Sequence, residues 1–147
     1  MSQEDEIRSL LRRWGRAVYR IREIERLKEA ISRELDTISD VRPQQLSGMP
    51  HSTNIGRPTE ENAFRRMAAE KNRISDLDEE EKILKRIIED AEWAVSFVPE
   101  RERKFLELHY LVGMSMEQVA SELYVSRSQA WNIEKKAIRI IIRFSSC

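Results

Sequence analysis

The C-terminal stretch of the chain carries a set of basic side chains that could bind a negatively charged partner. Within residues 124–147 one acidic residue, Glu134, accompanies five basic ones: Arg127, Lys135, Lys136, Arg139 and Arg143. Residues 99–147 hold 8 basic and 6 acidic side chains, whereas residues 1–98 hold 18 and 20. A basic helix behind a nearly neutral body predicts a nucleic-acid surface. A solvated helix face is the alternative.

The chain has few side chains that could perform catalysis or bind a metal. Its histidines are His51 and His109, and its single cysteine, Cys147, has no CxxC partner. A zinc site or a Ser-His-Asp triad needs more such groups, so we expect neither an enzyme nor a cofactor nor a metal. We expect His109 to be a half-buried scaffold residue. One cysteine cannot close an internal disulfide, which fits a cytoplasmic protein.

Length and composition limit the fold. A chain of 147 residues makes one domain or two very small ones. It is 35% charged and 7% aromatic, with only four glycines and four prolines. A sheet-rich domain needs turn residues about every 8–12 positions, and a Rossmann or P-loop enzyme needs a glycine-rich loop. The composition therefore predicts an all-α protein with long helices. No apolar run approaches the roughly 18 residues of a membrane span, and the acidic N-terminus is no signal peptide.

A heptad-like pattern predicts a long helix over residues 3–39, with Ser2 as its N-cap. Ten seam positions follow one another by threes and fours: Ile7, Leu10, Trp14, Ala17, Ile21, Ile24, Lys28, Ile31, Leu35 and Ile38. Lys28 is the polar exception, and such a residue often fixes register or oligomeric state. Three arginines, Arg12, Arg13 and Arg16, flank the seam as solvated charges, with non-specific DNA contact as the alternative.

Segment 40–58 is rich in proline and glycine and predicts a loop that reverses the chain. Thr59 is a suitable N-cap for a second heptad-like helix over residues 59–97. Together they predict a long antiparallel coiled-coil hairpin over residues 1–98. Because a lone two-helix seam buries little apolar surface, we expect this hairpin to form a homodimer or higher oligomer. The alternative is that the C-terminal part packs along the hairpin.

Residues 99–147 predict a module of three further helices. Pro99 favours a helix start, and the first helix is expected over residues 100–111. Two capping-box patterns follow, Ser115 with Gln118 and Ser126 with Gln129. Each consists of a serine and a glutamine three residues later and opens a helix. A short helix, a tight turn and a second capped helix, with the small Ala120 where they cross, form the helix-turn-helix pattern.

This module resembles region 4 of bacterial sigma factors and the regulators built on it. The resemblance covers about residues 99–143 and is carried by ERE before an apolar helix, G-M-S opening the next, VA-x-x-L, then V-S-R-S and I-E-x-K-A. The full layout is similar to small transcription regulators of Gram-positive phages and prophages, including the ArpU/RinA-type late-gene regulators. The run LSGMP at residues 46–50 resembles a segment of those relatives.

The resemblance implies that the last helix enters the DNA major groove. Arginine can bond guanine bidentately, and glutamine or asparagine can do so with adenine. The implied base readers are Arg127, Ser128, Gln129, Trp131 and Asn132, with Lys135 one turn further on. The implied phosphate contacts are Lys135, Lys136, Arg139 and Ser126. Two residues at the start of the preceding helix, Ser115 and Gln118, would hold the other backbone.

Two residues depart from the family's pattern. Tyr124 stands where a glycine is usual, at a turn position that often needs a positive φ, and a bulky residue adopts that φ at a cost. Either the turn differs here or some strain is tolerated. Trp131 stands where sigma factors often carry a basic or polar residue. It could stack on a sugar or contact a thymine methyl, and packing against the hairpin or a dimer mate is the alternative.

The resemblance implies a sequence-specific, dimeric DNA-binding regulator of phage or prophage genes, a late-gene activator in the bacterial cytoplasm. A sigma-like factor that binds RNA polymerase is an alternative, although no segment resembles the part of a sigma factor that melts the promoter. Another is the small subunit of a phage terminase, which recognises packaging DNA. A pure protein-interaction module, such as an anti-sigma factor that imitates region 4, is the last.

Overall fold

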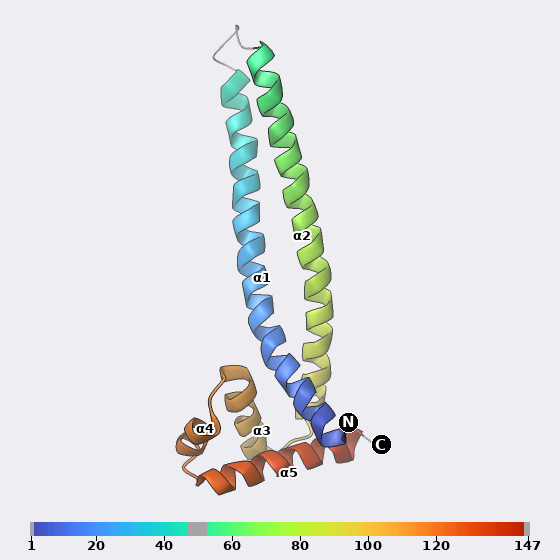
Figure 1. Ribbon diagram of the computed structural model, residues 1–147, viewed down its shortest axis with the longest axis vertical. Helices are drawn as coiled ribbons and strands as arrows, with labels where there is room; N and C mark the ends of the chain where they lie inside the picture. The colour runs from blue at the N-terminus through green and yellow to red at the C-terminus, as the bar shows by residue number, and fades with distance from the viewer. Residues whose placement is uncertain (1, 47–52, 146–147) are drawn as a thin grey trace. The chain divides into compact units, whose positions relative to one another are not determined.

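The computed structural model describes residues 2–46 and 53–145, and its regular structure is helical, as the composition predicts (Figure 1). The elements are α1 (Gln3–Leu46), α2 (Thr53–Val95), α3 (Glu100–Leu106), the π-helical segment η1 (Glu107–Val112), α4 (Met116–Glu122) and α5 (Arg127–Ser145). No helix among these described residues is long and apolar enough to cross a membrane.

The two long helices extend into the segment predicted as a loop. Helix α1 continues to Leu46 and α2 begins at Thr53, so the expected loop over residues 40–58 was too long. Thr59 is therefore inside α2 and does not cap it. The prediction failed because prolines were read as breaks, whereas Pro43 lies in the last turn of α1 and Pro58 in the second turn of α2. Residues 47–50 of the LSGMP run lie outside the described part of the chain.

The chain folds into two compact units, and each contains part of both long helices. Unit 1 consists of Met1–Ile21 and Ile83–Cys147, and unit 2 consists of Arg22–Lys82. This division differs from the predicted junction between residues 98 and 99. The physical reason is that the beginning of α1 supplies part of the apolar core around the C-terminal helices.

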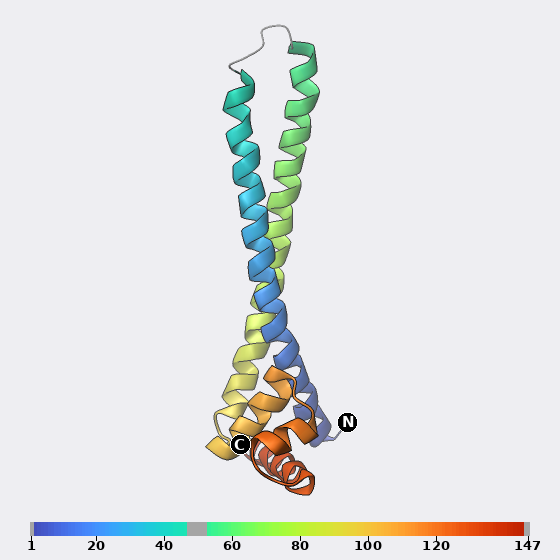
Figure 2. The same cartoon turned by 90° about the vertical axis from the view of Figure 1, so that its left-hand side faces the viewer.

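Within unit 2, α1 and α2 run side by side in opposite directions (Figures 1 and 2). Lys28 makes ion pairs across them with Asp78 and with Glu81, the latter 2.6 Å away. The carboxylates raise the pKa of Lys28 above its ordinary value, chiefly through the hydrogen bond with Asp78. The polar exception in the seam is thus satisfied by acids of the opposite helix. The predicted antiparallel pairing is confirmed for this segment.

The core of unit 1 joins the beginning of α1, the end of α2 and all the C-terminal helices. Its buried members are Leu11, Trp14, Ala91, Ala94, Val95, Val98, Phe105, Leu106, Val119, Ala120, Ala130, Ile133, Ala137 and Ile141. Ala130, Ile133, Ala137 and Ile141 of this set lie three or four positions apart, so α5 turns one apolar face toward this core. Gly15 lets α1 approach η1 closely, because a Cβ atom there would lie 2.1 Å from the carbonyl oxygen of Tyr110.

Candidate nucleic-acid interface

Both predicted capping boxes are present and fix the starts of α4 and α5. The Ser115 N–H donates to Gln118 Oε1 over 2.9 Å, and the Gln118 N–H donates back to Ser115 Oγ over 3.2 Å. At α5 the Ser126 N–H donates to Gln129 Oε1 over 2.9 Å, and the Gln129 N–H donates to Ser126 Oγ over 3.1 Å. Each box satisfies two amides that a helix start leaves unpaired.

The turn between α4 and α5 contains the strained residue that the sequence indicated. Tyr124 has a φ of +57°, in the left-handed region that a bulky side chain adopts at a cost. Its side chain is 96% exposed and so gains no packing in return. The Val125 N–H donates to the Ala120 carbonyl over 2.9 Å, which closes the turn. The strain is therefore tolerated, and the turn keeps its geometry.

Helix α5 separates an apolar face from a polar one. Ala130, Ile133 and Ala137 are buried in the core of unit 1. All eleven residues predicted to contact DNA are exposed: Ser115, Gln118, Ser126, Arg127, Ser128, Gln129, Trp131, Asn132, Lys135, Lys136 and Arg139. Trp131 is 43% exposed. The structure thus gathers the α5 residues of this set on the side of the helix away from the core.

Several of these side chains already have partners. Arg127 lies 3.3 Å from Glu117 in an exposed ion pair. Lys136 lies 3.4 Å from Glu102 of α3, whose side chain is only 6% exposed. Lys136 therefore compensates a buried carboxylate, which makes it a weaker candidate for phosphate than the sequence suggested. By contrast, no ion pair engages Lys135 or Arg139 within the described ranges.

Gln129 has a role that limits how it can read a base. Its Oε1 atom accepts the hydrogen bond of the capping box, so the amide nitrogen is the group left with both hydrogens available. The same holds for Gln118 at the start of α4. A bidentate contact of Gln129 with adenine would have to share Oε1 with the Ser126 amide. Asn132 lies one turn before Lys135 on the exposed face, and it belongs to neither capping box, so both its amide oxygen and its amide nitrogen can contact a base.

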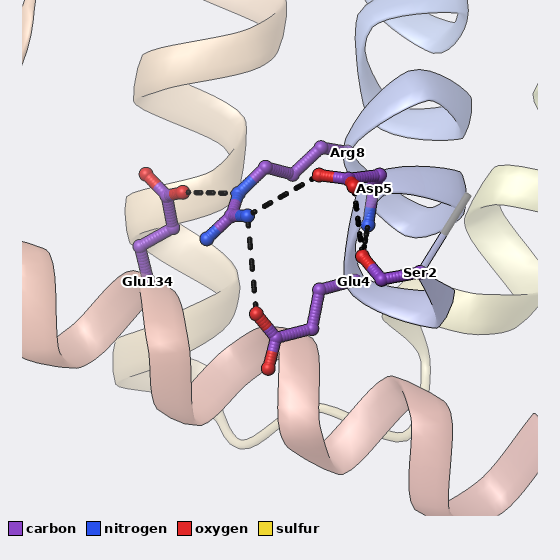
Figure 3. A network of polar contacts seen from close by, with 5 residues as sticks. All are labelled: Ser2, Glu4, Asp5, Arg8 and Glu134. Carbon is purple, nitrogen blue, oxygen red and sulfur yellow. Dashed lines mark hydrogen bonds and ion pairs between the residues drawn. The ribbon is translucent and has the colours of Figure 1, made fainter.

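Sequence reasoning missed the contact that anchors α5. The Nε atom of Arg8 donates to Glu134 Oε1 over 3.1 Å, and Arg8 also lies within 4.0 Å of Glu4 and Asp5 (Figure 3). Its hydrogen bond with Glu134 raises the pKa of Arg8 above its ordinary value. The available signal was the position of Glu134 between Ile133 and Ala137, since an acid on an apolar helix face needs a partner. Nearby, the predicted cap is confirmed, because the Asp5 N–H donates to Ser2 Oγ over 3.2 Å.

The described residues hold no group of three or more His, Cys, Asp or Glu side chains that could bind a metal ion. The arrangement is instead that of a binding surface. A capped helix presents amide, guanidinium and ammonium donors on one exposed face, and these groups complement phosphate oxygens and base edges.

Comparison with known proteins agrees with this geometry. A search of the curated proteins found no match to the chain, and a search of the solved structures found none either. Residues 95–141 match the family Sigma-70, region 4, from the last residue of α2 into α5. The matched segment contains α4, the turn and α5 as far as Ile141, and it supports a DNA-binding, sigma-like or helix-turn-helix regulatory role. The C-terminal module is therefore similar to region 4 of the Sigma-70 family.

Proposed function

We propose that the protein is a sequence-specific DNA-binding transcription regulator that reads the major groove with α5. The observation that carries the proposal is the exposed polar face of α5, the second helix of a capped helix-turn-helix similar to Sigma-70 region 4. A helix of this kind fits the major groove and places its N-terminal residues against base edges. It is a binding protein rather than an enzyme, and it acts in the cytoplasm of a bacterial host on phage or prophage late genes.

The positions of the exposed side chains suggest that the N-terminal end of α5 contacts bases and that its later turns contact phosphates. Arg127, Ser128 and Asn132 carry donors or acceptors at its N-terminal end, where base edges would lie. Lys135 and Arg139 follow one and two turns later, exposed and without an ion pair in the described ranges, and would bind phosphates. Trp131 supplies an exposed apolar surface for a thymine methyl or a sugar.

We further propose that the regulator is a homodimer formed through the long helices. Support comes from unit 2, where, among the residues whose burial the structure describes, Ile24, Ile31 and Leu77 are the buried apolar ones and Phe64 is half exposed. A helix pair that buries so little is more stable against a second pair. Its half-sites would then be spaced by whole helical turns, about 34–36 Å or a multiple of it. Light scattering over a concentration series would test this, and a monomer at all concentrations would contradict it.

The first experiment is to capture sheared phage and host genomic DNA with the purified full chain and sequence what it retains. Enrichment directly upstream of a gene block would support the promoter regulator and supply its operator. Enrichment at a packaging site would favour a terminase small subunit instead. Absence of any enrichment would reject DNA binding by the protein alone and favour a protein-interaction module.

Matched variants then test the assignment of residues. Lys135→Ala should weaken binding to all sequences alike, because phosphate contacts carry no sequence information. Asn132→Ala and Gln129→Glu should relax specificity at one base pair each, by about 1–3 kcal/mol. Glutamate can still accept the Ser126 amide and keep the cap. Gln3→Glu adds the same charge at the exposed start of α1, outside the proposed DNA contacts, and serves as the control. Unchanged specificity in both α5 variants would show that this face does not read bases.

A sigma-like factor that binds RNA polymerase is the second candidate function, favoured by the match of residues 95–141 to Sigma-70 region 4. Transcription with core polymerase distinguishes the two. A sigma-like factor would direct initiation by the core enzyme alone, whereas a regulator would act only when a complete sigma factor is present.

A further inference from the structure

A second basic site lies in unit 1, between α1 and η1. It is a pocket of about 430 Å³ lined by Arg12, Gly15, Arg16, Tyr19, His109 and Tyr110. None of these residues belongs to the exposed face of α5 to which base reading is assigned. Gly15 allows the two backbones to meet at the base of the pocket, since any side chain there would collide with the Tyr110 carbonyl.

The groups that line this pocket are suited to an anion. Arg12 and Arg16 stand one helical turn apart, so their guanidinium groups can converge on one ligand. Both are exposed, and neither has an ion-pair partner within residues 2–46 and 53–145. No carboxylate lines the pocket. Unlike Arg8, which is engaged by Glu134, these two arginines retain all their donors.

The tyrosines of the pocket add further donors, whereas His109 does not. His109 is half-buried, as expected, and its Nδ1 atom donates to the Met114 carbonyl over 2.8 Å, so Nε2 of the neutral ring is an acceptor and His109 shapes the pocket rather than donating to an anion. Tyr19 is 73% exposed and offers its hydroxyl. Tyr110 also lines the pocket; a tyrosine hydroxyl is protonated at neutral pH, and burial raises the pKa of this one further, to about 12.

The charge pattern of α1 favours a polyanion over a small anion. Residues 7–21 contain five arginines, Arg8, Arg12, Arg13, Arg16 and Arg20, and no acidic residue. Three of them, at positions 8, 12 and 16, follow the i, i+4 row of the helix from the Glu134 contact to the pocket. Arg8 is engaged by Glu134, so Arg12 and Arg16 are the members of this row that face the pocket. His109 of the pocket bonds the carbonyl of Met114, the residue before Ser115, so the pocket adjoins the start of the helix-turn-helix.

We propose that this pocket binds the phosphodiester backbone of DNA that flanks the site read by α5, with Arg12 and Arg16 as the phosphate ligands. The inference rests on the proposed DNA-binding function and extends it. The flanking contact adds affinity and salt dependence without sequence information. An acidic segment of a protein partner is the competing occupant, and the experiment separates the two.

The test measures affinity against salt concentration for the full chain on two duplexes. The long duplex carries the captured operator with at least one helical turn of flanking DNA on each side, and the short one is trimmed to the operator. For Arg12→Gln/Arg16→Gln we expect weaker binding to the long duplex and a salt slope reduced by about 1.8, since each phosphate contact contributes about 0.9. Binding to the short duplex and the preference for operator over random DNA should stay unchanged.

Two further variants control for charge. Arg13→Gln/Arg22→Gln removes the same charge from exposed positions of α1 outside the pocket and should leave most of the slope intact. The Arg12→Lys/Arg16→Lys variant keeps both positive charges and should therefore keep the salt slope of the parent chain. An unchanged slope for the Arg12/Arg16 glutamine variant, or an equal loss in the Arg13/Arg22 variant, would overturn the inference while the proposed function stands. A second assay measures how much RNA polymerase the immobilised chain retains. If the Arg12→Gln/Arg16→Gln variant retains less polymerase while its DNA binding is unchanged, the pocket binds an acidic protein segment and the inference is overturned. A parent chain that binds no DNA would reject both proposals.

Discussion

Arg8 of α1 and Glu134 of α5 meet over 3.1 Å, although 126 positions separate them in the sequence (Figure 3). The Glu134 side chain is 4% exposed and that of Arg8 is 24% exposed. A carboxylate removed from water to this degree costs several kcal/mol unless a cation and hydrogen bonds compensate it. The pair therefore links the position of the proposed recognition helix to the beginning of the chain.

Removal of Arg8 should destabilise the protein. We expect Arg8→Met to lower the free energy of unfolding by about 2 kcal/mol, because it keeps aliphatic packing but leaves Glu134 buried without its cation. Arg8→Met/Glu134→Met should recover most of the loss. Arg33→Met is the control, since Arg33 pairs with Glu29 on the surface and should cost less than about 1 kcal/mol. Urea unfolding followed by circular dichroism measures all four proteins, and equal effects at positions 8 and 33 would contradict the assignment.

The close contact between α1 and η1 requires a glycine at position 15. A Cβ atom there would lie 2.1 Å from a backbone oxygen, so the helices must separate in Gly15→Ala. We expect a loss of about 3 kcal/mol or more, at the upper end of overpacking effects. Gly113→Ala offers a comparison, because it has open space but a φ of +88° and should cost only about 1–2 kcal/mol. Thermal unfolding ranks the two, and a milder effect at position 15 would refute the close approach.

The turn residue Tyr124 can be improved by substitution. Tyr124→Gly should raise stability by about 1 kcal/mol, because glycine adopts the observed φ of +57° without strain and the exposed tyrosine loses no packing. Tyr124→Ala keeps the backbone strain and should give no comparable gain. Denaturant titration of the three proteins decides the point, and a glycine variant no more stable than the alanine variant would mean that the turn carries no strain.

The raised pKa of Tyr110 predicts how the free energy of unfolding changes in alkaline solution. Burial, aided by the charge of Glu134, raises its pKa to about 12 from an ordinary value of 10. Above pH 10 the unfolded chain therefore releases this proton while the folded chain retains it, so stability is complete below pH 10 and falls as pH rises toward 12. The loss should reach about 2 kcal/mol. Urea titrations across this range should show a flatter decline for Tyr110→Phe, whereas Tyr19→Phe, at an exposed tyrosine, should follow the parent curve.

The features predicted best were those set by neighbours in the sequence. The two capping boxes depend on a serine and a glutamine three positions apart, so the sequence located the starts of α4 and α5. The α5 residues that the resemblance to region 4 implied as DNA contacts are also exposed. Tyr124 was identified because a turn of this kind needs one residue with positive φ.

The features that were missed depend on residues far apart in the chain. Nothing near Arg8 indicates that it pairs with Glu134, and nothing near Arg12 indicates that it lines a pocket with His109. Such contacts follow from how α1 packs on the C-terminal helices, which no local pattern specifies. The sequence named Gln129 both in the capping box and as an implied base reader, but it did not show that the capping bond occupies Oε1 and so restricts the proposed base contact.

The composition of unit 1 has a consequence for the order in which the protein is made. Unit 2 is continuous in the chain, whereas unit 1 needs both Met1–Ile21 and Ile83–Cys147. A ribosome adds about 5–20 residues per second, so on the order of 10 s pass between the synthesis of Arg8 and that of Glu134. During that interval Leu11 and Trp14 have no core to enter. The nascent chain thus exposes the apolar face of the first turns of α1 until α5 has been synthesised. The core around the helix-turn-helix is therefore the last part of the protein to form.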